Sequence, residues 1–330
     1  MMTVLVTGGA GFIGSHIVEE LVRRGAKVRV MDNLSTGDMA FLAAVQGRIE
    51  FVQGDVTDLQ AVRQAMRGIT HVVHEAAMRS IPRSLEDPVL CHQINVTGTL
   101  QILLAAREAK VRRVVLASSS SVYGDVATYP VREDYPCRPA SPYAVSKLAG
   151  ELYGELFQQL YGLEVVRLRY FNVFGPRMDG ESGYAMAVPR FVTSMLRGES
   201  PPVFGDGRQS RDFIFVENVA AATVGALEAP AIGPGVFNIG CGQEISVLEL
   251  VQTINRLLQT TIAPRHLPAK PGESRRTWAD IRQARDHLQF EPRISLEDGL
   301  SKTIAWFRQP RYTDTSATSR PQTSHRRPDA

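Results

Sequence analysis

A glycine-rich turn near the start of the chain restricts the possible folds more than any other feature. The sequence Gly-Gly-Ala-Gly-Phe-Ile-Gly stands between an expected strand at Val4–Thr7 and an expected helix at Ile13–Arg23. Such a turn is typical of a dinucleotide-binding unit, in which the helix N-terminus faces a pyrophosphate. Glycine permits the tight turn at Gly8, close approach of the backbone to the pyrophosphate at Gly11, and close helix–strand packing at Gly14.

The segments that follow alternate between short β-branched runs and stretches with helical spacing. The expected strands are Lys27–Met31, Glu50–Gly54, His71–Glu75, Arg113–Ser118 and Glu164–Tyr170. The expected helices include Val89–Ala109 and Pro142–Tyr161. This alternation predicts an α/β fold of the Rossmann type, a doubly wound parallel sheet with helices on both faces.

A change in composition after Asn172 predicts a second, smaller structural unit. The chain becomes rich in Gly and Pro turns, and we expect a C-terminal substrate-binding α/β domain at 173–308, interleaved with a Rossmann domain at 1–172. Residues 309–330 are dominated by Ser, Thr, Arg and Pro and are expected to be disordered.

Composition argues against several classes of function. A net charge of +3 in 330 residues gives no reason to expect a nucleic-acid partner. Three scattered cysteines do not form a disulfide framework or a metal site. No signal segment is evident and no run looks long enough to cross a membrane, so we expect a cytoplasmic enzyme without a membrane partner.

Asp32 indicates which dinucleotide binds. It ends the second strand, where a carboxylate accepts hydrogen bonds from ribose hydroxyls and repels a 2′-phosphate, so NAD is favoured over NADP. Asp55, which follows the third strand, is equally well explained as a turn cap. Small residues at Ala76 and Ala77 allow a cofactor to pass closely, although tight helix–sheet packing also explains them.

A tyrosine and a lysine four residues apart indicate redox chemistry. On the expected helix, Tyr143 and Lys147 share one face. Lys147 can bind a ribose and favour the phenolate of Tyr143 through its charge, which would make Tyr143 a usable base. Four serines at 118–121 end the fifth strand, on the edge of the sheet where ligands bind in such folds.

With these motifs the chain resembles the extended short-chain dehydrogenase/reductase family, over residues 2–308. Within that family it is similar to nucleotide-sugar 4-epimerases, through the runs Ser-Ser-Ser-Ser-Val-Tyr-Gly at 118–124, Arg-Tyr-Phe-Asn-Val-Phe-Gly at 169–175 and Ser-Arg-Asp-Phe at 210–213. The resemblance implies Tyr143 as the base, Ser119 as its partner on the sugar hydroxyl, and Lys147 as the ribose anchor. Hydride would leave C4 for NAD and return to the opposite face of a 4-keto sugar.

The motifs and the resemblance together give the expected ligand-binding residues. For NAD they are Gly8, Gly11, Phe12, Ile13, Gly14, Asp32, Asn33, Ser35, Thr36, Gly37, Asp55, Val56, Ala76, Ala77, Asn95, Tyr143, Lys147, Tyr170 and Phe171. For a UDP-sugar they are Ser80, Ser119, Ser120, Tyr143, Asn172, Ala187, Val188, Phe204, Arg211, Glu273 and Thr277.

The identity of the sugar follows from a few positions. Ser120 and Ser121 stand where related dehydratases and decarboxylases carry an acid, which argues against both of those reactions. The resemblance implies that Thr277 stands at a gate position, where a small residue leaves room for an acetamido group. We therefore expect a UDP-N-acetylglucosamine/N-acetylgalactosamine 4-epimerase that also accepts UDP-glucose and UDP-galactose. Arg79 stands where several such epimerases have a small residue, and it favours an acidic sugar such as UDP-glucuronate.

Three further expectations concern the class of protein and its assembly. An NAD-dependent nucleotide-sugar oxidoreductase is one alternative, and a catalytically silent NAD-binding scaffold is another. The joint presence of Ser119, Tyr143 and Lys147 argues against the scaffold. The resemblance also implies a homodimer formed by helices near 90–108 and 142–161, although burial within one chain explains the leucines of the second helix equally well.

Overall fold

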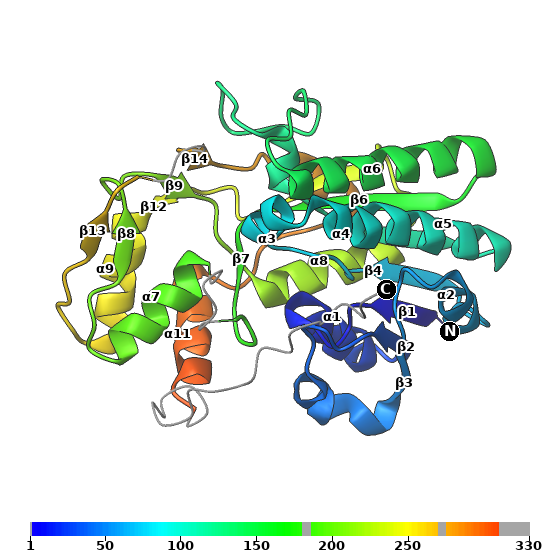
Figure 1. The fold of residues 1–330 in the computed structure, drawn as a ribbon, viewed down its shortest axis with the longest axis horizontal. Helices are drawn as coiled ribbons and strands as arrows, with labels where there is room; N and C mark the ends of the chain where they lie inside the picture. Colours follow the sequence, from blue (N-terminus) through cyan, green and yellow to red (C-terminus); the bar gives the residue numbers. More distant parts are fainter. Residues whose placement is uncertain (1, 180–185, 270–274, 310–330) are drawn as a thin grey trace, which may run out of the picture.

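The computed structural model describes residues 2–179, 186–269 and 275–309. Within them, seven strands form one parallel sheet in the order β11-β6-β5-β4-β1-β2-β3 (Figure 1). The strands are β1 (Thr3–Thr7), β2 (Lys27–Asp32), β3 (Ile49–Gln53), β4 (His71–His74), β5 (Arg113–Ser119), β6 (Glu164–Tyr170) and β11 (Val236–Ile239). This order reverses direction beside β1, as in Rossmann folds, and confirms the predicted fold class.

Helices cover both faces of the sheet because the side chains of each strand alternate between two cores. Val4 and Val6 pack in one core with α1 and α8, whereas Leu5 packs in the other with α2, α5 and α6. These helices are α1 (Phe12–Arg23), α2 (Leu59–Ala65), α5 (Gly98–Glu108), α6 (Pro142–Tyr161) and α8 (Val216–Glu228). A 3₁₀ segment, η1 (Met39–Arg48), lies between β2 and β3.

Helix α6 and strand β6 have the predicted bounds. Ser141 caps α6 by accepting a hydrogen bond from the Ala144 N–H at 3.2 Å, Pro142 occupies its first turn, and Gly162 ends it in the left-handed conformation.

The long helix expected before β5 is interrupted. It consists of α4 (Pro88–His92), a π-helical turn η2 (Gln93–Thr97) and α5. The expectation that no run is long enough to span a membrane is wrong on length and composition alone, because the most apolar window of 18 residues within the helical run Pro88–Glu108 has a mean hydropathy of 1.3. Half of its most apolar window is buried in the fold, where α5 packs against α2 and α6, and this packing accounts for its apolar character.

A smaller lobe lies beside the edge of the sheet where β6 ends (Figure 1). Its helices are α7 (Ala187–Leu196), α9 (Val247–Leu258) and α11 (Leu296–Phe307), whereas α10 (Arg282–Leu288) packs against β11 and α8 of the main sheet. Its short strands pair as β7 (Val173–Phe174) with β10 (Ile214–Phe215), β8 (Pro202–Phe204) with β13 (Arg265–Leu267), and β9 (Ser210–Arg211) with β12 (Ile245–Ser246) and β14 (Arg276–Thr277). The division at 172/173 stays a prediction, because β11 returns from the second unit to complete the main sheet.

Candidate functional site

The glycine turn after β1 leaves no room for side chains. Gly8 has a φ of +68°, and a Cβ there would lie 2.6 Å from the backbone nitrogen of Ala76. A Cβ on Gly14 would lie 2.2 Å from the carbonyl oxygen of Gly8. Gly11 is the N-cap of α1, and within the described residues no side chain caps this helix start. The turn therefore presents backbone N–H groups and a positive helix end, which suit a pyrophosphate.

Asp32 is held at the end of β2 by the backbone of its own neighbourhood. Its two carboxylate oxygens accept hydrogen bonds from the Ala10 N–H at 3.0 Å and the Leu34 N–H at 2.8 Å. Burial raises the pKa of Asp32, and these two backbone donors act in the opposite direction. A carboxylate has further acceptor sites, so Asp32 can still bind ribose hydroxyls. The residues present fit NAD.

The other residues that we expect to bind NAD differ in how exposed they are. Asn33, Ser35 and Thr36 are exposed, whereas Phe12, Ile13, Gly37, Ala76 and Ala77 are half-buried. Asp55 accepts hydrogen bonds from the N–H and hydroxyl of Thr57 and from Asn33, which confirms that it caps a turn; its contact with an adenine stays a prediction. Val56 is buried.

Successive side chains of a strand point to opposite faces of the sheet, so Ser118 and Ser119 at the end of β5 have different surroundings. The buried Ser118 donates to Glu151. Ser119 is half-buried, and it accepts hydrogen bonds from the N–H of Ser121 at 3.2 Å and from its hydroxyl at 3.0 Å. A hydrogen bond with Ser119 is also one of the effects that lower the pKa of Tyr143. Ser119, rather than Ser118, is therefore the serine beside Tyr143. Ser120 begins the 3₁₀ turn η3 (Ser120–Tyr123).

Tyr143 and Lys147 share one face of α6, as predicted. The Lys147 Nζ lies 5.9 Å from the centre of the Tyr143 ring and donates to the carbonyl oxygen of Ala117 at 2.8 Å. Burial raises the pKa of Tyr143 to about 12 and lowers the pKa of Lys147. The expected lowering of the Tyr143 pKa by Lys147 stays a prediction, because the effects that lower this pKa come from Ser119 and Arg79.

Asn95 connects the loop after β4 to the helix that carries Tyr143. Its side-chain oxygen accepts from the Met78 N–H at 2.7 Å, and its side-chain nitrogen donates to the Met78 carbonyl at 3.0 Å and to Ser146 at 2.9 Å. Asn95 is buried in the π-helical turn η2. It therefore positions α6, while its contact with a cofactor stays a prediction.

The two aromatic residues expected beside the nicotinamide differ. Tyr170 ends β6 and hydrogen-bonds to Glu75 at 2.8 Å. Phe171 is 1% exposed and packs in a separate hydrophobic cluster with Val122, Tyr123 and neighbouring residues. Packing accounts for Phe171, so its predicted contact with a cofactor has no support in its position.

The residues expected to bind the nucleotide gather partly around β9 and β14. Asn172 donates to Thr277 at 2.8 Å and to the carbonyl oxygen of Asp212 at 3.0 Å. Thr277 pairs in register with Arg211. These residues thus lie together although they are distant in the sequence.

The remaining expected substrate residues are more scattered. Ala187 and Phe204 are half-buried, whereas Val188 is 2% exposed and part of the core. Ser80 caps the short helix α3 (Ile81–Glu86), which supports the capping explanation for it. Glu273 lies outside the described residues.

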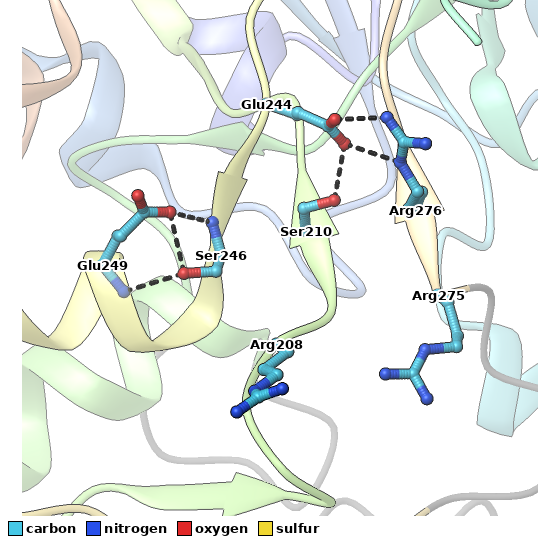
Figure 2. Close-up of a pocket in the computed structure, with 7 residues that line it drawn as sticks. All are labelled: Arg208, Ser210, Glu244, Ser246, Glu249, Arg275 and Arg276. Atoms are coloured by element: carbon cyan, nitrogen blue, oxygen red, sulfur yellow. Dashed lines mark hydrogen bonds and ion pairs between the residues drawn. The ribbon is translucent and has the colours of Figure 1, made fainter.

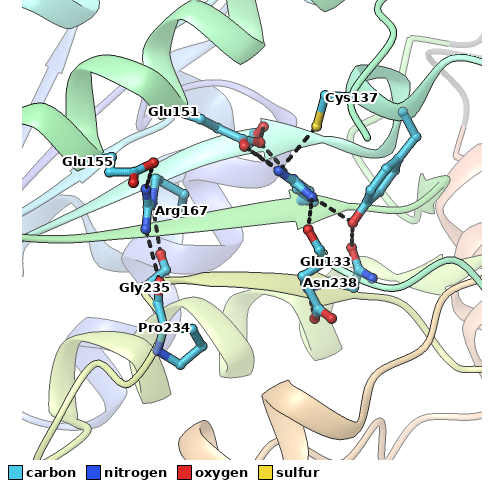
Figure 3. Close-up of polar contacts among 11 residues, drawn as sticks. Glu133, Cys137, Glu151, Glu155, Arg167, Pro234, Gly235 and Asn238 are labelled. Atoms are coloured by element: carbon cyan, nitrogen blue, oxygen red, sulfur yellow. Dashed lines mark hydrogen bonds and ion pairs between the residues drawn. The ribbon is translucent and has the colours of Figure 1, made fainter. Parts of the chain in front are cut away.

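A buried polar network, which the sequence reasoning missed, fastens α6 to the sheet (Figure 3). Arg169 of β6 forms an ion pair with Glu151 of α6 at 2.7 Å, and both side chains are 6% exposed. The guanidinium also donates to the Tyr123 hydroxyl at 2.8 Å and to the Glu133 carbonyl oxygen at 3.1 Å. Glu151 follows Tyr143 and Lys147 at helical spacing, and arginine inside an apolar strand is unusual; both are signals that a closer inspection could use.

A surface pocket of about 490 Å³ lies in the smaller lobe, and Tyr143 is not among the residues that line it (Figure 2). Arg208, Arg275 and Arg276 line it, and Glu244 binds both Arg276 and Ser210. Ser210 and Arg211 are consecutive in β9, so their side chains point to opposite faces. We therefore assign this pocket no part in the site around Arg211.

The fold and this cluster define an NAD-binding enzyme of the short-chain dehydrogenase/reductase class. Residues 4–240 match the NAD dependent epimerase/dehydratase family, and the chain belongs to that family. A UDP-glucose 4-epimerase of Mycolicibacterium smegmatis is 40% identical over 313 residues, which cover 93% of this chain and 99% of that protein.

Solved structures show the same relationship. The UDP-N-acetylglucosamine 4-epimerase of Methanobrevibacter ruminantium, solved with UDP-N-acetylmuramic acid, has a TM-score of 0.89 and 38% identity, covering 93% of this chain and 98% of that one. The UDP-glucose 4-epimerase of Thermus thermophilus, solved with NAD, has a TM-score of 0.85 and 36% identity, covering 93% and 99%.

Proposed function

We propose that this enzyme interconverts the C4 epimers of a UDP-hexose, with UDP-N-acetylglucosamine and UDP-N-acetylgalactosamine as its main pair and UDP-glucose and UDP-galactose as a second pair. The observation that carries the proposal is the placement of Ser119 beside Tyr143, with Lys147 one helical turn away, at the carboxyl edge of the sheet. Bound NAD supplies the acceptor and donor of the hydride.

The residues of the chain then divide the proton chemistry between them. Tyr143 accepts the proton of the C4 hydroxyl and returns it after the 4-keto sugar has turned. Ser119 orients that hydroxyl, and Lys147 holds the cofactor ribose. Tight binding of the UDP group near Asn172 and Arg211, combined with weak contacts to the sugar, allows the turn. Orientation of the reacting groups supplies much of the rate.

Thr277 supports the choice of an N-acetylated sugar. Its hydroxyl accepts from Asn172 and from the Asp212 N–H, so its small side chain is fixed against β9. A small, fixed side chain at the entrance leaves space that a large aromatic residue would fill.

Arg79 supports a second candidate, UDP-glucuronate. It is exposed on the loop after β4, and its charge lowers the pKa of Tyr143, so it lies near the reacting groups. Within the described residues its guanidinium has no hydrogen-bond or ion-pair partner, and a sugar carboxylate would supply one.

A panel of UDP-sugars tests the proposal. The purified protein is incubated with each sugar, without added reductant, and the epimers are separated by chromatography. We expect conversion of the N-acetylhexosamine pair, and Arg79→Ala should retain it. Preferred conversion of UDP-glucuronate that Arg79→Ala abolishes would establish the second candidate instead. No conversion of any sugar would favour the scaffold.

We also propose that the enzyme is a homodimer. Leu152 and Leu156 of α6 are 59% and 43% exposed, and Leu85 and Val89 of the adjoining helices are each 64% exposed. Packing within one chain therefore does not explain these leucines, and a second copy of the same face would cover them.

The combined change of Leu152→Glu and Leu156→Glu is expected to convert the dimer to a monomer, because the carboxylates would have to be buried in the interface. Light scattering coupled to size exclusion measures the mass. The matched control, Gln252→Glu on the exposed side of α9, should remain dimeric. A double variant that stays dimeric would show that the subunits meet elsewhere.

A further inference from the structure

A buried acidic side chain adjoins the residues expected to bind the nucleotide and has no part in the reaction described above. Asp212 follows β9 directly and is 0% exposed. Its Oδ1 accepts a hydrogen bond from the Cys241 N–H at 2.7 Å, and its Oδ2 accepts from the N–H groups of Gly242 and Ala279, each at 3.1 Å. One of these backbone segments follows β11 and the other follows β14. The carboxylate therefore joins two segments that are distant in the sequence to the end of β9.

The backbone around this carboxylate leaves no room for a further side chain. A Cβ on Gly240 would lie 2.8 Å from Oδ2 of Asp212 and 2.9 Å from the Cβ of Ala279. Contacts this short would force the carboxylate or the segment after β14 to move. Glycine at position 240 thus permits the close approach on which the three hydrogen bonds depend.

The main chain of Asp212 contacts the residues expected to hold the nucleotide. Its carbonyl oxygen accepts from the side chain of Asn172 at 3.0 Å, and its N–H donates to the Thr277 hydroxyl at 3.4 Å. Arg211 precedes it in β9 and pairs in register with Thr277. The position of Asp212 therefore affects all three of these residues.

The donors around Asp212 distinguish a carboxylate from an amide. Backbone N–H groups can only donate, and an amide has one accepting oxygen where a carboxylate has two. An asparagine at this position would turn its NH₂ group toward at least one buried N–H and leave it without a partner. Burial raises the pKa of Asp212 to about 7, whereas the N–H groups of Cys241, Ala279 and Gly242 act in the opposite direction. Measurements at pH 8.5 therefore keep the carboxylate ionised.

We propose that Asp212 is a positioning residue for the UDP group of the substrate. Its carboxylate fixes the segments after β11 and β14 against β9, and its main chain then holds Asn172 and Thr277 in place beside Arg211. Asp212 acts through these three residues, so the inference rests on the roles that the proposed function gives them.

Asp212→Asn tests the proposal through the binding of UDP alone, which requires neither turnover nor knowledge of the sugar. Isothermal titration calorimetry of the NAD-bound enzyme at pH 8.5 measures the Kd. We expect the Kd to rise by about tenfold or more, as for the loss of one buried hydrogen bond. With the UDP-sugar that the wild type converts, KM should rise in proportion while kcat changes less than about threefold, because Ser119, Tyr143 and Lys147 are unchanged.

Two further variants make the test specific. Asp280→Asn is the matched control, because this carboxylate is also largely buried, at 8% exposed, but binds Arg282 instead of the backbone around β9. It should keep the wild-type Kd for UDP. Gly240→Ala retains the Asp212 carboxylate but crowds it, and should also raise the Kd.

A wild-type Kd in Asp212→Asn would overturn the proposal even if the variant unfolds more easily, because a purely structural role lowers the free energy of unfolding without changing the affinity of the folded protein. Equal rises in Asp212→Asn and Asp280→Asn would overturn it as well. Should Asp212→Asn fail to fold, an unchanged Kd in Gly240→Ala would decide against it.

Failure of the proposed function would give a different result. A wild-type enzyme that binds no UDP would contradict the proposed function, and this role of Asp212 with it. A wild type that binds UDP but converts no UDP-sugar would contradict the proposed reaction alone, and a raised Kd in Asp212→Asn would still support the positioning role.

Discussion

Tyr143→Phe is expected to abolish detectable epimerisation, with a fall in kcat of about 10²- to 10⁴-fold or more, because the proposed mechanism assigns the exchange of the C4 proton to this phenol. NAD should remain bound, since the glycine turn, Asp32 and Lys147 are unchanged. Initial rates with the UDP-sugar converted by the wild type, and the NAD released on denaturation, measure the two effects.

Tyr153→Phe is the matched control for this change. Tyr153 lies on the same helix and packs against the core formed by α2, α5 and α6, away from Ser119. The control should keep the wild-type rate. If Tyr143→Phe also kept it, the role of base would have to pass to another residue.

Arg169→Ala should have the largest effect on stability. It leaves Glu151 buried and without its ionic partner, and the loss of one member of a buried ion pair costs about 3–5 kcal/mol in the free energy of unfolding. The variant should also lose activity, because α6 carries Tyr143 and Lys147. Urea denaturation measures the change in stability.

Two comparisons make this prediction specific. Adding Glu151→Leu to Arg169→Ala should recover part of the lost stability, since it removes the unpaired charge. Arg132→Ala, which breaks an exposed ion pair with Asp134, should change stability little. Equal losses in Arg132→Ala and Arg169→Ala would show that burial of the pair has no special importance.

Features with strong local signals could be predicted from the sequence. The cap at Ser141, the proline beside it and Gly162 define α6, and a short run with two adjacent valines after Gly162 indicates β6. The parallel sheet followed from the order of such segments. The interruption of the helix before β5 was missed, because a π-helical turn depends on the tertiary contacts of Asn95 rather than on a local pattern.

The electrostatics of the site could not be predicted in the same way. The spacing of Tyr143 and Lys147 shows that they share a helix face, but it does not show how much water reaches them, and burial decides their pKa values. Similarly, the motif that contains Tyr170 and Phe171 does not reveal that the two rings enter different packed clusters. The partnership of Arg169 with Glu151 joins a strand to a helix, and a pattern within either segment alone cannot show it.

The return of β11 to the main sheet restricts how such a protein can diversify. This strand pairs with β6 after the chain has passed through the first part of the smaller lobe, and the chain then re-enters the lobe at β12, so the sheet interrupts the lobe in the sequence. A truncation after β6 would bare a row of unpaired backbone groups along that strand. Changes in the loops of the lobe can therefore alter the substrate specificity. Replacement of the whole lobe would also remove β11, and the nucleotide-binding sheet would lose its edge strand.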